Sequence, residues 1–245
     1  MREFGLIGFP LSHSFSKKYF TEKFEKEKLQ NCRYENFPIQ SIGLLQEIIK
    51  NTPFLEGLNV TIPFKEAIIP FLHDMTDDVK EIKACNCVKI IRNILYGFNT
   101  DTIGFQQTII KKLQPAHKKA LILGTGGAAK AVAYVLRELN IEFVYVSRST
   151  SGPGFHYEEL TEEIIKSHPI IVNTTPVGMW PNHQFAPPIP YEFITNKNFL
   201  FDLIYNPEKT LFLQKGLEKG ATIQNGQEML IIQAEESWKI WNTSL

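Results

Sequence analysis

Short, mostly apolar runs alternate with amphipathic stretches along almost the whole chain. Residues 4–8, 57–60 and 120–123 have the length and the apolar character expected of buried strands. Between such runs, residues 17–28 and 126–139 place their apolar side chains at helical spacing. A regular alternation of strands and helices of this kind predicts an α/β fold.

The same pattern predicts the remaining elements. Further strands are expected at residues 34–38, 85–92, 95–98, 143–146, 170–172, 199–203 and 221–223, and further helices at residues 44–50, 77–82, 102–112, 160–165, 210–219 and 226–241. The strands at 85–92 and 95–98 are close enough to form a hairpin that bends at Arg92 and Asn93. A cluster of prolines within residues 181–190 predicts a loop there.

Composition and charge narrow the class of protein. The chain has 245 residues, of which 43% are hydrophobic and 21% charged, which is sufficient for one large core or two smaller ones. Lysine plus arginine and aspartate plus glutamate both number 26, so no net charge favours nucleic acid or an anionic membrane. No apolar run approaches the about 18 residues of a membrane span, and the N-terminus does not resemble a signal peptide. We therefore expect a cytoplasmic protein.

The cysteines do not indicate a disulfide framework or a metal site. Cys32, Cys85 and Cys87 are an odd, small number for a chain of this length, and no histidine pair completes a zinc-binding pattern. We expect no metal and interpret the cysteines as ordinary strand residues.

A glycine-rich segment follows the apolar run at 120–123 and precedes an alanine-rich helix. Its residues are Gly124, Thr125, Gly126, Gly127 and Ala128. In a dinucleotide-binding turn the first glycine permits the tight turn and the second lets the backbone approach a pyrophosphate. The helix N-terminus then supplies N–H groups and partial positive charge. A tight strand–helix turn without a ligand is the alternative.

The end of the next strand indicates which dinucleotide would bind. An acidic residue there would bond the ribose 2′-hydroxyl of NAD, but this chain has Ser147, Arg148, Ser149 and Thr150. A guanidinium with neighbouring hydroxyls can hold a 2′-phosphate. The sequence therefore favours NADP, although a solvated loop arginine is an alternative interpretation of Arg148.

The glycine turn also suggests a division of the chain. We expect one domain over residues 1–101, to which the helix at about 226–245 returns, and a dinucleotide-binding domain over residues 102–225. The helix at 102–112 would connect the two domains. Ligand sites are common between domains of this kind.

Lys65 and Asp101 are candidates for acid–base chemistry. Removal of a hydride from a secondary alcohol requires a group that accepts the hydroxyl proton. A lysine can accept that proton when burial lowers its pKa or when a carboxylate orients it. The alternative is a surface lysine together with an aspartate that caps the helix after it.

Ser14 and Ser16 lie between a strand and a helix, where hydroxyl and N–H groups can face an anion such as a carboxylate. Ordinary hydroxyl caps of the helix are the alternative.

Several strings, in order along the chain, resemble the shikimate dehydrogenase family over almost the whole length. They are HSFS at 13–16, NVTIPFKE at 59–66, NTD at 99–101, GTGGAA at 124–129, NTTPVGM at 173–179, DLIYNP at 202–207 and NGQEMLIIQA at 225–234. The resemblance implies a substrate-binding α/β domain joined to a Rossmann domain. It also implies the reversible, NADPH-dependent reduction of 3-dehydroshikimate to shikimate in aromatic amino-acid biosynthesis.

The resemblance also implies roles for individual residues. Ser14 and Ser16 would hold the substrate carboxylate, and Lys65 would be the acid–base group, paired with Asp101. The ring hydroxyls and the reacting oxygen would meet Thr61, Asn86, Asp101, Tyr205 and Gln233. The cofactor site would be lined by Gly124 to Ala128, Ser147 to Thr150, Thr174, Leu203 and Gly226. Only small molecules are expected as partners. The protein is expected to be a monomer or a homodimer.

The chain departs from the family pattern at three places. Cys87 follows Asn86 where the family commonly has a threonine, and Lys17 follows Ser16 where a proline is usual. The segment after Ser147 has one arginine and no further cation nearby. The chain is also short for the family, and we expect the shortening in the Rossmann half.

Two other functions are compatible with these residues. One is a quinate/shikimate dehydrogenase that accepts NAD, and the other is a binding protein on the same fold that has no catalytic activity. Retention of Lys65 and Asp101 favours an enzyme, because a sensor needs no proton carrier.

Overall fold

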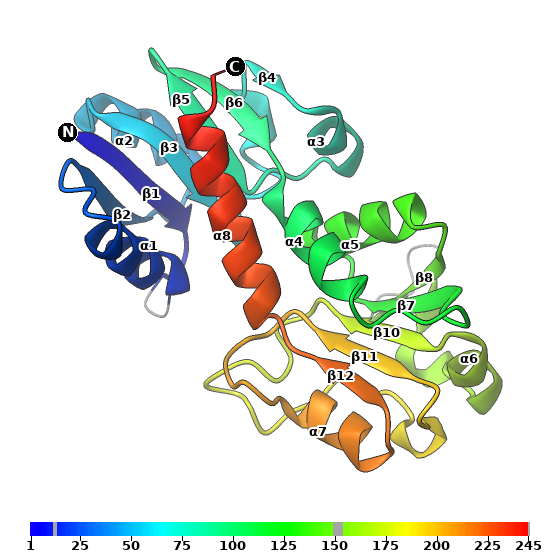
Figure 1. Cartoon of the computed structure of the whole chain (residues 1–245). Helices are drawn as coiled ribbons and strands as arrows, with labels where there is room; N and C mark the ends of the chain where they lie inside the picture. The colour runs from blue at the N-terminus through cyan, green and yellow to red at the C-terminus, as the bar shows by residue number, and fades with distance from the viewer. Residues whose placement is uncertain (12–13, 149–153, 245) are drawn as a thin grey trace. The chain divides into compact units, whose positions relative to one another are not determined.

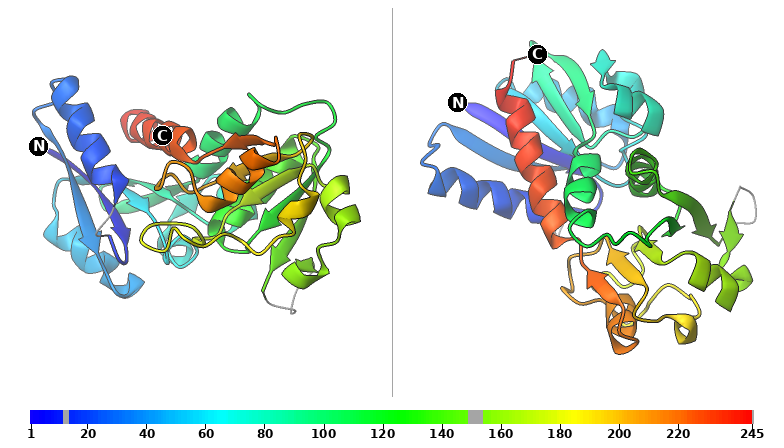
Figure 2. Two further views of the ribbon diagram at one scale, coloured as in Figure 1. Left: turned by 90° about the horizontal axis from the view of Figure 1, so that it is seen from below. Right: turned by 45° about the vertical axis from the view of Figure 1, so that its right-hand side comes forward.

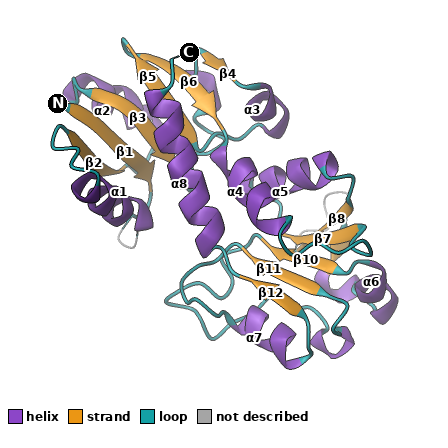
Figure 3. Cartoon of the chain, in the orientation of Figure 1, coloured by secondary structure: helices purple, strands orange, loops and turns teal. Residues whose placement is uncertain are grey.

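The computed structural model describes residues 1–11, 14–148 and 154–244. Strands and helices alternate along the chain, which confirms the α/β fold class (Figure 1 and Figure 3). The chain forms two compact units. Unit 1 comprises Met1–Thr100 and Ala234–Leu245, and unit 2 comprises Asp101–Gln233.

Unit 1 is built on a six-stranded sheet with the order β2-β1-β3-β5-β6-β4. Its strands are β1 (Arg2–Gly8), β2 (Cys32–Pro38), β3 (Leu55–Val60), β4 (Asp74–Met75), β5 (Cys87–Ile91) and β6 (Ile94–Phe98). The first three strands are parallel, whereas β5 runs antiparallel to both β3 and β6. The end of β3 therefore lies beside the start of β5, which brings segments far apart in the sequence to one edge of the sheet.

Helices cover both faces of this sheet. The helices of unit 1 are α1 (Phe15–Lys26), α2 (Leu45–Asn51) and α3 (Asp77–Ile82), together with the second half of α8 (Gln227–Asn242). Phe20 of α1 and Trp241 of α8 pack with Phe4 of β1 on one face. Leu45 of α2 and Val79 of α3 belong to the cluster on the other face. The C-terminal helix is thus part of the core of the first unit.

Unit 2 is built on a six-stranded parallel sheet with the order β12-β11-β10-β7-β8-β9. Its strands are β7 (Lys119–Leu123), β8 (Glu142–Ser147), β9 (Phe155–His156), β10 (Ile170–Asn173), β11 (Phe199–Asp202) and β12 (Thr222–Gln224). The first strand of the unit, β7, lies at the centre of the sheet, between β8 and β10. β8 and β9 follow on one side of β7, and β10, β11 and β12 follow on the other side. This is the strand order of a Rossmann fold, whose ligands bind at the central switch point.

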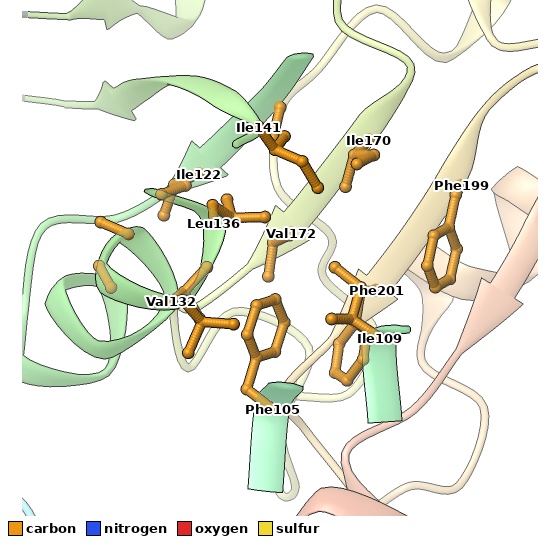
Figure 4. Packing of buried hydrophobic residues seen from close by; sticks show 14 of the residues in the cluster. Phe105, Ile109, Ile122, Val132, Leu136, Ile141, Ile170, Val172, Phe199 and Phe201 are labelled. Atoms are coloured by element: carbon orange, nitrogen blue, oxygen red, sulfur yellow. The ribbon is translucent and has the colours of Figure 1, made fainter. Parts of the chain in front are cut away.

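Two helical layers enclose the sheet of unit 2 (Figure 2). The helices that begin in or belong to this unit are α4 (Thr100–Ile109), α5 (Gly127–Glu138), α6 (Glu162–Ser167), α7 (Leu211–Glu218) and the first half of α8. Phe105 and Ile109 of α4 and Val132 of α5 pack on one face of β7, β10 and β11 (Figure 4). Ile165 of α6 and Phe212 of α7 pack on the opposite face.

The structure also contains short elements that the hydrophobic pattern does not reveal. β4 and β9 have two residues each, which is too short for a period to show. Single turns of 3-10 helix occur at Ile42–Leu44, Ile69–Phe71, Tyr157–Glu159 and Tyr191–Phe193. In the part of the chain that the structure describes, no helix combines the length and the apolar character that a membrane span requires.

Every expected helix except that at 77–82 differs from the observed one by one to three residues at its ends, and two of these differences concern how the helix begins. The helix expected at 160–165 is Glu162–Ser167, because Thr161 acts as its N-cap and accepts a hydrogen bond from the N–H of Ile164. The helix expected at 102–112 begins at Thr100. Asp101 therefore lies within the first turn of α4 instead of preceding the helix, where a carboxylate complements the helix dipole.

Candidate active site

One edge of the sheet of unit 1 gathers the polar residues predicted from the sequence. The N–H of Thr61 donates to the carbonyl of Ile7 at 3.0 Å, and the N–H of Val60 donates to the carbonyl of Asn86 at 2.8 Å. These bonds connect the ends of β1 and β3 to the turn that precedes β5. Thr61 and Asn86 are therefore neighbours, although 25 residues separate them in the sequence.

Lys65 lies beside the same edge. It is half-buried in a turn after β3, and its carbonyl accepts a hydrogen bond of 2.7 Å from the N–H of Cys85. This bond anchors the lysine turn to the turn that carries Asn86. The structure thus brings the segment of Thr61 and Lys65, which follows β3, beside the turn of Asn86, which precedes β5.

Ser14 does not act as the helix cap that the sequence left open as an alternative. It occupies the N-cap position of α1, yet its side chain makes no capping hydrogen bond. Its hydroxyl oxygen is buried and has no hydrogen-bond partner among the described residues. Because a buried hydroxyl without a partner is costly, this arrangement is typical of a group that meets a ligand.

Ser16 is half-buried in the first turn of α1. Asn86 is held by a hydrogen bond within unit 1, because its side-chain oxygen accepts the N–H of Thr100 at 2.7 Å. This bond joins the turn before β5 to the start of α4, one residue before Asp101.

Within unit 2, Asp101 and Gln233 lie on helices that approach closely. A Cβ on Gly104 would lie 2.7 Å from the carbonyl oxygen of Met229 and 3.3 Å from the Cβ of Gln233. Only glycine permits this approach between α4 and α8. Since Asp101 is three residues before Gly104, Asp101 and Gly104 share one face of α4. Lys65 belongs to unit 1 and Asp101 to unit 2, so their pairing stays a prediction.

The glycine turn lies at the switch point of the Rossmann sheet. Gly124 follows β7 with a φ of 108°, a left-handed conformation that favours glycine. A Cβ at this position would lie 2.8 Å from the hydroxyl of Thr174, which follows β10 and donates to the carbonyl of Leu123 at 2.6 Å. The two residues are thus in contact at the crevice between β7 and β10.

The N-terminus of α5 has the properties of a phosphate site. Gly126 is its N-cap, no side chain among the described residues caps it, and its first turn holds no acidic residue. The space beside the α-carbon of Gly126 is open to 4 Å among the described residues. Backbone N–H groups and the helix dipole are therefore available to an anion, and these residues fit the pyrophosphate of a dinucleotide.

Three further predicted residues follow β11 or precede α8. The N–H of Gly226 donates to the carbonyl of Ile204 at 3.0 Å, which places Leu203 and Tyr205 next to Gly226. Leu203 itself donates its N–H to the carbonyl of Asn173 at 3.0 Å. The carboxyl ends of β10 and β11 thus carry Thr174, Leu203 and Tyr205 in succession.

The segment that selects the cofactor is described in part. Ser147 ends β8 and pairs in register with His156 of β9, and the exposed Arg148 follows. A ring nitrogen of His156 lies 3.0 Å from the carbonyl oxygen of Arg148. Ser149 and Thr150, which the sequence also assigns to the cofactor site, are outside the described residues.

The buried carboxyl of Asp202 forms hydrogen bonds with residues at and after the ends of β10 and β11. Asp202 accepts hydrogen bonds from Asn173 at 3.0 Å, from the N–H of Ile204 at 3.1 Å and from Thr210 at 2.6 Å. Burial nevertheless dominates and raises the pKa of Asp202 from 3.8 to about 7, although these three bonds oppose the shift.

This pKa predicts a pH dependence of stability. The folded protein holds the proton of Asp202 more tightly than the unfolded chain, so the contribution is full below about pH 4 and is lost as the pH rises to about 7. The slope within that window approaches about 1.4 kcal/mol per pH unit. We expect Asp202→Asn to remove this component, so that the Tm difference between wild type and variant changes from pH 4 to 7. Thermal unfolding curves with a constant Tm difference across this range would contradict the assignment.

The described residues contain no group of three or more His, Cys, Asp or Glu side chains that could hold a metal ion.

Sequence reasoning missed three residues of the site. Tyr34 and Ser237 contribute buried hydroxyls in unit 1, and His156 contacts Arg148 in unit 2. Ser237 follows Gln233 by four residues on one helix, so helical periodicity could have identified it. No local signal pointed to Tyr34 or His156, because their contacts depend on strand register.

The chain is similar to known proteins in both sequence and structure. Residues 6–88 match the model of the shikimate dehydrogenase substrate binding domain. The chain is 35% identical to a shikimate dehydrogenase (NADP+) of Caldicellulosiruptor bescii, over 98% of this chain and 89% of that protein.

Solved structures resemble the chain as a whole. Shikimate dehydrogenase from Aquifex aeolicus matches with a TM-score of 0.87 and 33% identity, covering 99% of this chain and 92% of that one. Shikimate 5-dehydrogenase from Thermus thermophilus, in complex with NADP(H) and shikimate, matches with a TM-score of 0.87 and 29% identity, covering 100% of this chain and 95% of that one.

Proposed function

The chain belongs to the shikimate dehydrogenase family, and on that premise we propose that it reversibly reduces 3-dehydroshikimate to shikimate with NADPH. The observation that carries the proposal is the convergence of a half-buried lysine with Thr61 and Asn86 at one edge of unit 1. A lysine beside hydroxyl and amide groups suits a polyhydroxylated substrate whose alcohol must lose or gain a proton.

The substrate carboxylate is assigned to Ser14 and Ser16. The buried hydroxyl of Ser14, which has no partner among the described residues, supports this role because a carboxylate accepts such a hydrogen bond. The ring hydroxyls are assigned to Thr61, Asn86, Asp101, Tyr205 and Gln233. Their hydroxyl, amide and carboxylate groups can both donate to and accept from hydroxyls.

Lys65 is assigned as the acid–base group. In the reductive direction its ammonium donates a proton to the oxygen of the ketone as that carbon receives the hydride, and in oxidation the amine takes the proton back. Asp101 would orient the amine of Lys65 by accepting its hydrogen bond. The position of Asp101 in the first turn of α4 gives that carboxylate a fixed backbone.

The dinucleotide is assigned to the carboxyl edge of the sheet in unit 2. Its pyrophosphate would meet the turn from Gly124 to Ala128, and its 2′-phosphate would meet Arg148 with Ser147, Ser149 and Thr150. Thr174, Leu203 and Gly226 would line the rest of the site. When bound, NADP supplies or receives the hydride.

The broader assignments follow from the same proposal. Residues 1–101 with 226–245 would form the substrate-binding domain, and residues 102–225 the cofactor-binding domain. The enzyme would act in the cytoplasm, as a monomer or homodimer, on small molecules in the route to chorismate and the aromatic amino acids.

An absorbance assay at the NADPH band tests the proposal. Shikimate or quinate is offered with NADP or NAD in all four combinations. We expect rapid reduction of NADP with shikimate and much lower rates in the other combinations. Comparable rates with quinate or NAD would indicate a quinate/shikimate dehydrogenase, and folded protein without turnover in any combination would indicate a binding protein.

Ser14→Ala tests the carboxylate site. Loss of a hydrogen bond to a charged group corresponds to an expected rise of about 10- to 100-fold in the KM for shikimate, with kcat and the KM for NADP nearly unchanged. Ser41→Ala is a matched control, because Ser41 caps a 3-10 turn elsewhere in unit 1. Steady-state kinetics of the three proteins would contradict the role if the KM for shikimate stayed at the wild-type value.

A further inference from the structure

A network of hydrogen bonds crosses the interior of unit 1 and ends at Asn86, one of the proposed substrate-binding residues. It begins at Tyr34 of β2. The hydroxyl of Tyr34 donates to the side-chain oxygen of Asn59 at 2.8 Å, and the amide of Asn59 donates to the hydroxyl of Ser237 at 2.9 Å. Ser237 thereby connects the C-terminal helix to β2 and β3.

The network of hydrogen bonds continues from Ser237 to Asn86. The hydroxyl oxygens of Ser237 and Thr100 are 3.3 Å apart, and the amide nitrogen of Asn86 lies 3.1 Å from the hydroxyl of Thr100. The N–H of Thr100 also donates to the side-chain oxygen of Asn86 at 2.7 Å. Asn86 is thus held at both ends of its amide by a single residue, whose hydroxyl in turn contacts Ser237.

The bonds also define which way each amide faces. The amide nitrogen of Asn59 faces the carbonyl of Asn86 at 3.4 Å, so its oxygen faces Tyr34. The backbone N–H of Thr100 requires an acceptor, so the side-chain oxygen of Asn86 faces that N–H and its nitrogen faces the hydroxyl of Thr100. A substrate therefore meets an Asn86 side chain whose orientation is already determined.

Because the residues of this network are buried, the loss of one of its hydrogen bonds is costly. Ser237 and Thr100 are fully buried, and Tyr34, Asn59 and Asn86 expose 2%, 6% and 3% of their surfaces. Water cannot replace a lost partner at such positions, and a fully satisfied buried network specifies one arrangement of its members. Ser237 lies where the branches from Asn59 and Thr100 meet.

We propose that Ser237 is a positioning residue for substrate binding, which orients Asn86 through Thr100 and is itself held in place by Asn59 and Tyr34. Ser237 touches neither substrate nor cofactor in this role. The proposal rests on the proposed function, because it assumes that Asn86 contacts the substrate. Its consequence is that a buried hydroxyl on the last helix contributes to affinity for shikimate and not to affinity for NADP.

Calorimetric titration with shikimate and with NADP tests the proposal without requiring turnover. We expect Ser237→Ala to weaken shikimate binding by about 5- to 20-fold and to leave the Kd for NADP within about twofold. Thr108→Val is the matched control, because it removes an equally buried hydroxyl from unit 2, where Thr108 bonds the carbonyl of Gly104. The control is expected to lower Tm without changing either Kd.

Double variants distinguish positioning from a general loss of stability. If Ser237 acts through Asn86, Ser237→Ala should have little further effect on shikimate binding in an Asn86→Ala background. In a Ser14→Ala background its effect should be retained in full, because the Ser14 hydroxyl makes no hydrogen bond to the described residues of this network. A stability effect would be the same in both backgrounds.

Thr100→Val provides a second route if Ser237→Ala fails to fold. It keeps the backbone N–H and the side-chain shape but removes the hydroxyl between Asn86 and Ser237, and it should weaken shikimate binding in the same way. Unchanged shikimate affinity in a folded Ser237→Ala or Thr100→Val protein overturns the inference, as does full additivity with Asn86→Ala. Failure of the wild type to bind shikimate overturns the proposed function itself.

Discussion

Replacement of Lys65 by alanine is expected to lower kcat for shikimate oxidation by about 100- to 10,000-fold, the range that general acid–base groups contribute. The KM values for shikimate and NADP should change far less, since the lysine acts mainly when the proton moves. The side chain is half-buried in a turn whose backbone is anchored by the Cys85 N–H, so its removal should not disturb the fold. Steady-state kinetics measures kcat and the two KM values, and circular dichroism shows whether the variant keeps its fold.

Two further lysine variants test whether the loss of kcat is specific to the amine of Lys65. Lys65→Arg keeps the positive charge but stays protonated at working pH, so it should be nearly as inactive in oxidation as alanine. Lys80→Ala removes an exposed lysine of the same unit, which pairs with Asp77 on the surface, and should keep full activity. A Lys65→Ala enzyme with the wild-type kcat would exclude the acid–base assignment.

Arg148→Ala is expected to raise the KM for NADP by about 10- to 100-fold while that for NAD stays almost constant, because only NADP carries the 2′-phosphate. Arg148 is exposed at the end of β8, and its carbonyl is held by His156. It is the cation that the sequence places in this segment, so its loss should remove most of the discrimination between the two cofactors. The ratio of kcat/KM values for NADP and NAD is the measurement.

Arg137→Ala is the matched control for this prediction. Arg137 is an exposed arginine in the last turn of α5, at the opposite end of that helix from the glycine turn. Its removal should leave the cofactor ratio unchanged. An equal loss for NADP and NAD in Arg148→Ala would show that the guanidinium contributes to folding or to general cofactor binding instead of contacting the 2′-phosphate.

Local patterns were sufficient for most of the fold. The apolar runs at 120–123 and 170–172 became β7 and β10 because strands buried on both faces are apolar throughout. The bend at Arg92 and Asn93 was recognisable from two polar residues between apolar runs, and both have positive φ. β9 escaped prediction because a two-residue strand depends entirely on its neighbour β8.

Some residues of the candidate site could likewise be recognised from local sequence, and others could not. The glycine turn could be identified from the sequence, because its spacing encodes a local backbone conformation, which φ at Gly124 bears out. The role of Ser14 could not, because a serine before a helix is equally consistent with a cap. Only the structure revealed that its hydroxyl makes no capping bond.

The sequence by itself determined the α/β class, the Rossmann turn and the family, since each depends on residues that are contiguous or regularly spaced. The tertiary structure alone decided which distant side chains meet. Asn59 and Ser237 bond across 178 residues, and Gly104 brings α4 against α8. Such contacts depend on strand register and on how helices pack against the sheet, and these are properties of the whole fold that no local pattern encodes.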